Sequence, residues 1–184
     1  MKIIDILTSP WAIVPDKLLE IQEIYSTHLR GEKIDIKAVE AKIGEASNKE
    51  EAPYKIINEI AIIEIHGVIA KRMNLFSQIS GGVSTQLVGN NITQALNDSE
   101  IKGILLDIDS PGGSVEGTQE LSEIIFNGRK KKPILAFSDG MIASAAYWIA
   151  SAAHEIYISS DTVTIGSIGV VATHIDKTRY EEKI

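Results

Sequence analysis

A serine set among small residues is the clearest sign of chemistry in this sequence. Ser144 lies in the run Asp139-Gly-Met-Ile-Ala-Ser-Ala-Ala-Tyr-Trp148, where an apolar helical pattern begins. Upstream, Asp109-Ser-Pro-Gly-Gly-Ser114 places two adjacent glycines directly after a strongly apolar strand pattern. A serine that faces a Gly-Gly turn can attack a carbonyl carbon while backbone N–H groups hold the oxyanion. The two segments together favour chemistry of the serine peptidase kind.

Each segment also has a simpler structural interpretation. Ser144 could be a helix N-cap or a small core residue, and from its position alone that interpretation is favoured. The glycines could form a strand-to-helix turn with Ser114 as the N-cap, because adjacent glycines readily adopt positive φ. The functional interpretation overtakes these two only because both segments occur together, each between a strand pattern and a helix pattern.

The elements that must position these residues fall into three parts. Residues 1–44 predict an N-terminal helical arm, with helices at 16–30 and 35–43 that end at glycines. Residues 45–57 predict a linker, since its first part is polar and charged. Residues 58–184 predict the main domain.

Within the main domain, short apolar runs alternate with helical patterns. This alternation predicts an α/β fold with a mainly parallel sheet that is covered on both faces. Residues 72–84, which contain Gly81-Gly82, predict a mobile loop. The expected strands are 60–65, 103–108, 133–137, 155–158 and 168–171, and the expected helices are 85–98, 115–127 and 143–153.

Composition restricts the class of protein. The chain has 184 residues, of which 44% are hydrophobic and 23% are charged, as in ordinary soluble domains. Its net charge of −7 argues against a nucleic-acid binder, and the absence of cysteine excludes disulfides, zinc–thiolate sites and thiol catalysis. The apolar runs are too short for a membrane span, and the N-terminus is a poor signal peptide. We therefore expect an intracellular protein without a cofactor.

Three motifs resemble those of a known family. Ser110-Pro-Gly-Gly113, Met141-Ile-Ala-Ser-Ala-Ala-Tyr-Trp148 and Gly166-Ser-Ile-Gly-Val170 occur in the order found in the S49 serine peptidases. That family includes the signal peptide peptidase SppA and the phage capsid proteases of the lambda protein C type. The resemblance covers about residues 58–184 and implies the ClpP/crotonase fold of repeated β-β-α units. The arm, with Ser9-Pro-Trp-Ala12 before a helix, resembles the phage-type members.

The resemblance also assigns roles to particular residues. It implies that Ser144 is the nucleophile and that the backbone of Gly112 and Gly113 forms the oxyanion hole. Ser167 matches a second serine that positions the general base, which in this family is a lysine. A buried lysine can serve as a base because desolvation lowers its pKa toward neutrality.

Two departures from the family pattern affect these expectations. Ala145-Ala146 replaces the Gly-Gly often found after the nucleophile, which we expect to narrow the site. The family's lysine lies farther along than the segment between Ser144 and Ile184. We therefore expect that this sequence stops before its lysine and that it is inactive alone.

The other titratable residues have structural interpretations that we favour over catalysis or metal binding. They are Lys177 and Lys183 in a charged run, His154 and His174, Asp107 and Asp109 beside a buried strand, and Arg129-Lys-Lys-Lys132 at a helix C-terminus.

The leading hypothesis is a phage or prophage endopeptidase of the S49 type that cleaves a capsid or scaffold protein. It would act in the bacterial cytoplasm or in the viral procapsid, as a homo-oligomer on a protein or peptide substrate. Three alternatives stay open: a catalytically inactive assembly or scaffold module, an SppA-like signal peptide peptidase, and a crotonase-like acyl-CoA enzyme. The last shares a double N–H oxyanion hole but has no need of Ser144.

Overall fold

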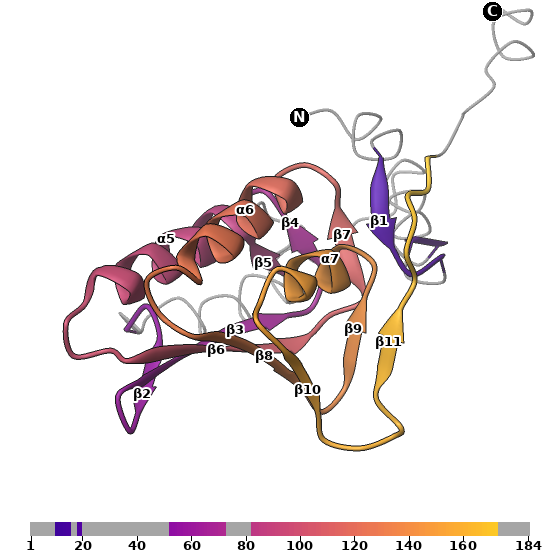
Figure 1. The fold of residues 1–184 in the computed structure, drawn as a ribbon. Coiled ribbons are helices and arrows are strands. Elements are labelled where there is room, and N and C mark those ends of the chain that lie inside the picture. The colour runs from indigo at the N-terminus through magenta and orange to yellow at the C-terminus, as the bar shows by residue number, and fades with distance from the viewer. Residues whose placement is uncertain (1–9, 16–17, 20–51, 73–81, 173–184) are drawn as a thin grey trace, which may run out of the picture.

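A parallel sheet forms the base of the molecule. The computed structural model describes residues 10–15, 18–19, 52–72 and 82–172 (Figure 1). Its largest sheet has the strand order β10-β8-β6-β3-β2, in which the first four strands are mutually parallel and β2 pairs antiparallel with β3 at the edge. These strands are β2 (Lys55–Ile57), β3 (Ile60–His66), β6 (Gly103–Asp109), β8 (Ile134–Ser138) and β10 (Ile156–Ile158).

Two smaller sheets stand beside the large one. The first has the order β1-β7-β4-β5, and the second pairs β11 with β9 in parallel. Their strands are β1 (Trp11–Ile13), β4 (Ile69–Ala70), β5 (Val83–Ser84), β7 (Gly112–Ser114), β9 (Met141–Ala143) and β11 (Thr164–Gly166). The short strands β7 and β9 follow β6 and β8 directly, so they carry the chain from the large sheet to the smaller ones.

The three helices labelled in Figure 1 lie on one face of the large sheet. They are α5 (Thr85–Asn97), α6 (Thr118–Gly128) and α7 (Ala145–Ser151). The core side chains alternate along the strands, as in β3, where Ala61, Ile63 and Ile65 are buried, because successive residues of a strand point to opposite faces. Leu105 and Leu135 of the other face are only partly buried. Within the described residues the helices thus cover one face, whereas the sequence led us to expect cover on both.

The predicted repetition of β-β-α units is confirmed. β6, β7 and α6 form one unit, and β8, β9 and α7 form the next. In each unit the first strand joins the large sheet and the second joins a small one. The α/β class with mainly parallel strands is confirmed as well.

Several boundaries differ from the sequence-based expectations. The strand expected at 168–171 is wrong: the strand is β11, and 168–171 makes only an isolated bridge from Val171 to Trp11. The backbone of Gly166 (φ 131°) and Ser167 (φ 56°) ends the strand pairing before residue 168. The expected linker 45–57 contributes β2.

The N-terminal part is described only at a few positions. The helices expected at 16–30 and 35–43 lie almost entirely outside the described residues, as does most of the loop expected at 72–84. The described residues of the arm include β1, which pairs with β7 of the main domain. No helix in the described part of the chain is long and apolar enough to cross a membrane.

Candidate active site

Ser144 stands on a strained turn between strand β9 and helix α7. Its backbone has φ 57° and ψ −113°, a conformation that non-glycine residues rarely adopt. Such a conformation costs on the order of 1–3 kcal/mol and persists where the surrounding structure enforces it. Here Ser144 N–H donates to Gly166 O at 2.8 Å, which ties the turn to β11. A serine on a sharp strand-to-helix turn has the geometry of a nucleophile elbow.

The side chain of Ser144 does not cap the helix that it precedes. Its hydroxyl makes no hydrogen bond to the first N–H groups of α7, and it donates instead to Gly169 O over a long 3.4 Å. Ser144 therefore stands at the N-cap position of α7, but its side chain does not perform the capping. A hydroxyl that is almost buried, at 6% exposure of the residue, and only weakly bonded can be redirected toward a substrate.

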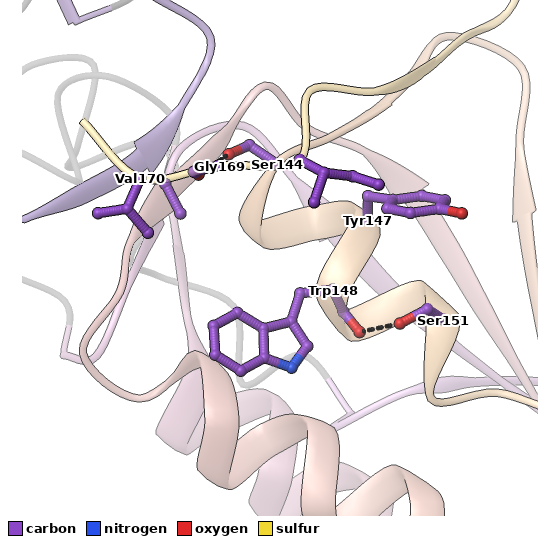
Figure 2. Close-up of a pocket in the computed structure, with 8 residues that line it drawn as sticks. Ser144, Tyr147, Trp148, Ser151, Gly169 and Val170 are labelled. Atoms are coloured by element: carbon purple, nitrogen blue, oxygen red, sulfur yellow. Dashed lines mark hydrogen bonds between the residues drawn. The ribbon is translucent and has the colours of Figure 1, made fainter.

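A pocket of about 350 Å³ opens beside this serine (Figure 2). Its walls come from three segments: β1, α7 and the stretch after β11. The lining residues are Ala12, Ser144, Tyr147, Trp148, Ser151, Ile168, Gly169 and Val170. In Figure 2, Tyr147, Trp148 and Ser151 follow along α7 from Ser144, while Gly169 and Val170 approach from the other side. The walls are mainly apolar, as suits the binding of a peptide with apolar side chains.

The structure brings Gly112 next to Ser144. Gly112 has φ +99°, and a Cβ added there would lie 2.9 Å from Ala143 O and 3.0 Å from Ser144 Cβ. A side chain at this position is therefore excluded both by the backbone conformation and by the approach of the serine. The sequence-based pairing of these two segments thus corresponds to a direct contact between β7 and the elbow.

The two predicted oxyanion donors have neighbours of their own in this structure. Gly112 N–H donates to Ser110 Oγ at 3.1 Å, and Ser110 Oγ in turn donates to Gly67 O at 2.6 Å. Gly113 lies opposite Ala12 in the pairing of β7 with β1. The Gly112 N–H group therefore points toward a partner that a substrate would have to share or replace.

Two further candidates for the site were missed in the sequence. The first is Ala145 N–H, which begins α7 and has no acceptor within its own helix, because the first turn of a helix leaves its N–H groups without carbonyl partners. The residue after an elbow nucleophile often supplies an oxyanion donor, which was the available signal. The second is Ser110, which is fully buried and fixes the backbone before the glycines.

Ser167, the second predicted serine, does not line the pocket. It follows Gly166, whose carbonyl holds Ser144 N–H, and it has φ 56°. Its side chain is exposed. The structure therefore places Ser167 one residue from a contact with the elbow, on the segment that leads to Ile168 and Gly169.

Other candidate residues have backbone partners away from the pocket. His154 Nδ1 lies 3.1 Å from Ile134 N, and Asp109 Oδ1 accepts from Met141 N–H at 3.0 Å. In the basic run, Arg129 donates to Ala153 O at 3.0 Å, as expected for a cation near helix ends. His174, Lys177 and Lys183 lie outside the described residues. The described residues contain no group of acidic and histidine side chains that could hold a metal ion.

Among the residues that the structure describes, four groups with displaced pKa values also lie away from the pocket. Burial raises the pKa of Tyr54, and Lys55 lowers the pKa of Glu64 by a hydrogen bond. Glu116 raises the pKa of Lys71, and Glu155 raises the pKa of Tyr157 by hydrogen bonds. None of the four lines the pocket, so none offers a base to Ser144.

Replacing Ser110 by alanine tests the support of the glycine turn. The variant leaves Gly67 O and Gly112 N–H without their buried partner, which costs about 1–3 kcal/mol of unfolding free energy. Urea unfolding followed by circular dichroism measures the loss. Ser159→Ala, at an exposed position, is the matched control and should change stability by less than about 0.5 kcal/mol. Equal stability of the two variants would contradict the supporting role of Ser110.

The sequence is similar to a peptidase family and to phage proteins. Residues 127–184 match the model of peptidase family S49. The head-tail preconnector protein GP5 of Enterobacteria phage P21 is 34% identical over 122 residues, and the capsid assembly protease C of Escherichia phage lambda is 35% identical over 121 residues. Protease 4 of Haemophilus influenzae is 30% identical over 118 residues.

These alignments cover most of this chain but a small part of each relative. They take in 66%, 66% and 64% of this chain, and 24%, 27% and 18% of the respective relatives. Among solved structures, a probable enoyl-CoA hydratase from Mycobacterium smegmatis has a TM-score of 0.45 at 18% identity, over 61% of this chain and 50% of that one. A ClpP1 variant from Listeria monocytogenes has a TM-score of 0.36 at 23% identity, over 50% of this chain and 46% of that one.

Proposed function

We propose that this chain is a peptidase of the S49 type and that Ser144 is its nucleophile, as the match to the S49 family model and the similar proteases support. The observation that carries the proposal is the strained backbone of Ser144 in contact with Gly112. Strain of this kind at a serine between a strand and a helix supports catalysis, because backbone outliers of this kind cluster at active sites. A crotonase-like acyl-CoA enzyme would leave this strain without a role.

The proposed reaction passes through an acyl-enzyme. Ser144 Oγ attacks the scissile carbonyl carbon and gives its proton to a general base, which passes it to the departing amine. Water then hydrolyses the ester and regenerates the serine. The negative charge on the carbonyl oxygen is held by backbone N–H groups, for which Gly112, Gly113 and Ala145 are the candidates. Helix α7 adds the positive end of its dipole at the same place.

The general base in this proposal is a lysine from beyond residue 184. The pocket residues include no lysine, histidine or carboxylate in the described part of the chain. A lysine that enters this apolar pocket would lose hydration, which lowers its pKa and makes the neutral amine available near neutral pH. Activity should then rise with pH as the lysine loses its proton.

A segment of residues 1–184 expressed alone should cleave far more slowly than a gene product that includes the lysine. A positioned general base contributes about 10²–10⁴-fold, so we expect a loss of that size. The measurement is cleavage of a fluorogenic peptide by both proteins at equal concentration. Strong cleavage by residues 1–184 that depends on Ser144 would contradict the proposed base. Lys177, Lys183, His154 and His174 would then be substituted in turn.

The proposed substrate is a capsid or scaffold protein, and the proposed site of action is the host cytoplasm or the procapsid. Two relatives are named as a phage preconnector protein and a capsid assembly protease, which supports this choice. A relative from Enterococcus faecium is named a putative signal peptide peptidase SppA, which is the reason to keep signal peptides as the second substrate class. Co-expression of the full-length gene product with the scaffold protein of the same genome tests the choice. Specific cleavage supports it, and cleavage of signal peptides alone would favour the alternative.

The proposed enzyme is a homo-oligomer. Large apolar side chains are exposed on the segment from β10 to residue 171, and subunit contacts would cover them. They are Tyr157, Ile158, Ile165, Ile168, Val170 and Val171. Light scattering on the full-length gene product at tens of micromolar should give a mass of several subunits. A mass of one subunit would contradict oligomerisation. Oligomers that lack peptidase activity would instead indicate a scaffold role without catalysis.

A further inference from the structure

Strand β1 occupies the edge of β7 beside the candidate nucleophile. β1 pairs antiparallel with β7, and Ala12 lies opposite Gly113. Val14, two residues after Ala12, donates its N–H to the carbonyl oxygen of Pro111, two residues before Gly113, at 3.0 Å. Because hydrogen-bonded pairs alternate in an antiparallel ladder, the pair of Ala12 and Gly113 belongs to the hydrogen-bonded kind. A peptide backbone therefore already lies along the strand that carries the proposed oxyanion donors.

The opposite edge of β1 is paired as well. Trp11 N–H donates to Val171 O at 2.9 Å, and Val171 N–H donates to Trp11 O at 2.7 Å. β1 thus lies between β7 and the stretch after β11, as Figure 1 shows for the indigo arrow beside β7 and the yellow segment. Pairing of an added strand with an existing sheet edge is a general way in which proteins bind extended peptides.

Ala12 brings this strand to the serine. Ala12 lines the same pocket as Ser144. The point where a Cβ on Gly112 would stand lies 2.3 Å from Ala12 O and 3.0 Å from Ser144 Cβ, so the carbonyl and the serine both pack against Gly112. Ala12, the residue of β1 that lines the pocket, is small, whereas its neighbours Trp11 and Ile13 are large, apolar and buried.

The strand order leaves a substrate no free edge of β7. In the described part of the chain, one edge of β7 pairs with β1 and the other pairs with β4. A substrate that pairs with β7 beside Ser144 must therefore take the place of β1, because β4 is continuous with the main sheet through β3. β1 is three residues long and comes from the segment that precedes the α/β units, so it can leave without breaking one of them.

We infer that the cleft beside Ser144 is a binding site for an extended peptide strand and that residues 10–14 of this chain are its resident ligand. The inference rests on the proposed function in one respect: the peptide that competes with residues 10–14 is taken to be the substrate of the peptidase. The preferred ligand is an extended segment with a small residue between two large apolar ones, as in Trp11-Ala-Ile13. The resident strand competes with such segments, so their apparent affinity equals the intrinsic affinity multiplied by the fraction of molecules in which the strand is undocked.

The experiment uses the full-length gene product with Ser144→Ala, so that no turnover is needed. The probe is an acetylated peptide with the sequence of residues 9–15, and the protein is labelled with ¹⁵N so that its own N-terminal peptide is distinguishable. Hydrogen exchange is followed by mass spectrometry with and without saturating probe. We expect the exchange of the β1 amides to increase when the probe binds, and a scrambled peptide to have no effect. Binding of the probe with unchanged exchange in β1 would overturn the inference.

A pair of variants measures the competition directly. Ile13→Ser removes a buried apolar side chain of β1, whereas Leu19→Ser changes an exposed residue of the same segment. Probe affinity, measured by fluorescence anisotropy, should be about tenfold or more tighter for Ile13→Ser than for Leu19→Ser. Equal affinities, or no probe binding to either variant and to the parent, would overturn the inference. Because none of these readouts needs catalysis, failure of the peptidase assignment would leave them unchanged and would appear only in activity and labelling assays.

Discussion

Ser144→Ala is expected to abolish peptide cleavage by the full-length gene product. Removal of the nucleophile eliminates the acyl-enzyme route, and in well-studied serine peptidases such a change lowers kcat by about 10⁶-fold. The variant should keep its fold, since the hydroxyl makes one long hydrogen bond and the swap removes a single small atom. The measurement is the initial rate on a fluorogenic peptide, together with the unfolding midpoint of the same sample.

Ser159→Ala serves as the control for that result. It changes an exposed serine outside the pocket and should keep the parent rate. Cleavage that survives in Ser144→Ala would remove this serine from the mechanism. A loss of folding in Ser144→Ala would contradict the view that the elbow is held by backbone contacts, such as that of Ser144 N–H with Gly166 O.

Gly113→Ala is expected to have the largest effect on stability. A Cβ at this position would lie 1.9 Å from Ile69 O and 2.6 Å from Ile69 N, closer than any side chain can approach a backbone. Because β7 and β4 are paired at these two residues, the strands would have to separate. We expect destabilisation by more than about 4 kcal/mol, measured by urea unfolding or as loss of soluble protein.

Gly169→Ala is the matched control for Gly113→Ala. An added Cβ at Gly169, which lines the pocket, meets no atom within 4 Å. Its unfolding free energy should stay within about 0.5 kcal/mol of the parent. Similar stabilities of the two alanine variants would show that the close packing of β7 on β4 does not hold in solution.

The central elements were predictable because their patterns are strong and local. The runs 60–65 and 103–108 are short, apolar and β-branched, and they correspond to β3 and β6 within a residue. The helix expected at 85–98 corresponds to α5, since its apolar positions repeat with the helical period. The order of the Gly-Gly motif and the serine motif, each after a strand, also sufficed to predict that Gly112 and Ser144 meet.

The remaining features depend on contacts between distant parts of the chain. Three residues, Trp11 to Ile13, carry no period that indicates a strand, and β1 exists because β7 and Val171 lie on its two sides. The strand expected at 168–171 rested on β-branched residues, but the positive φ of Ser167 prevents continuation of β11. The strain at Ser144 and the buried hydrogen bonds of Ser110 likewise follow from tertiary packing, which sequence patterns do not report.

Covalent labelling of Ser144 tests the central claim most directly. The full-length gene product is treated with a peptidyl fluorophosphonate that carries a small residue next to the phosphorus, and the adduct is located by mass spectrometry after digestion. We predict a single adduct on Ser144, absent from Ser144→Ala and present in Ser159→Ala. An adduct on a different residue, or equal labelling of Ser144→Ala, would contradict the assignment of Ser144 as the nucleophile.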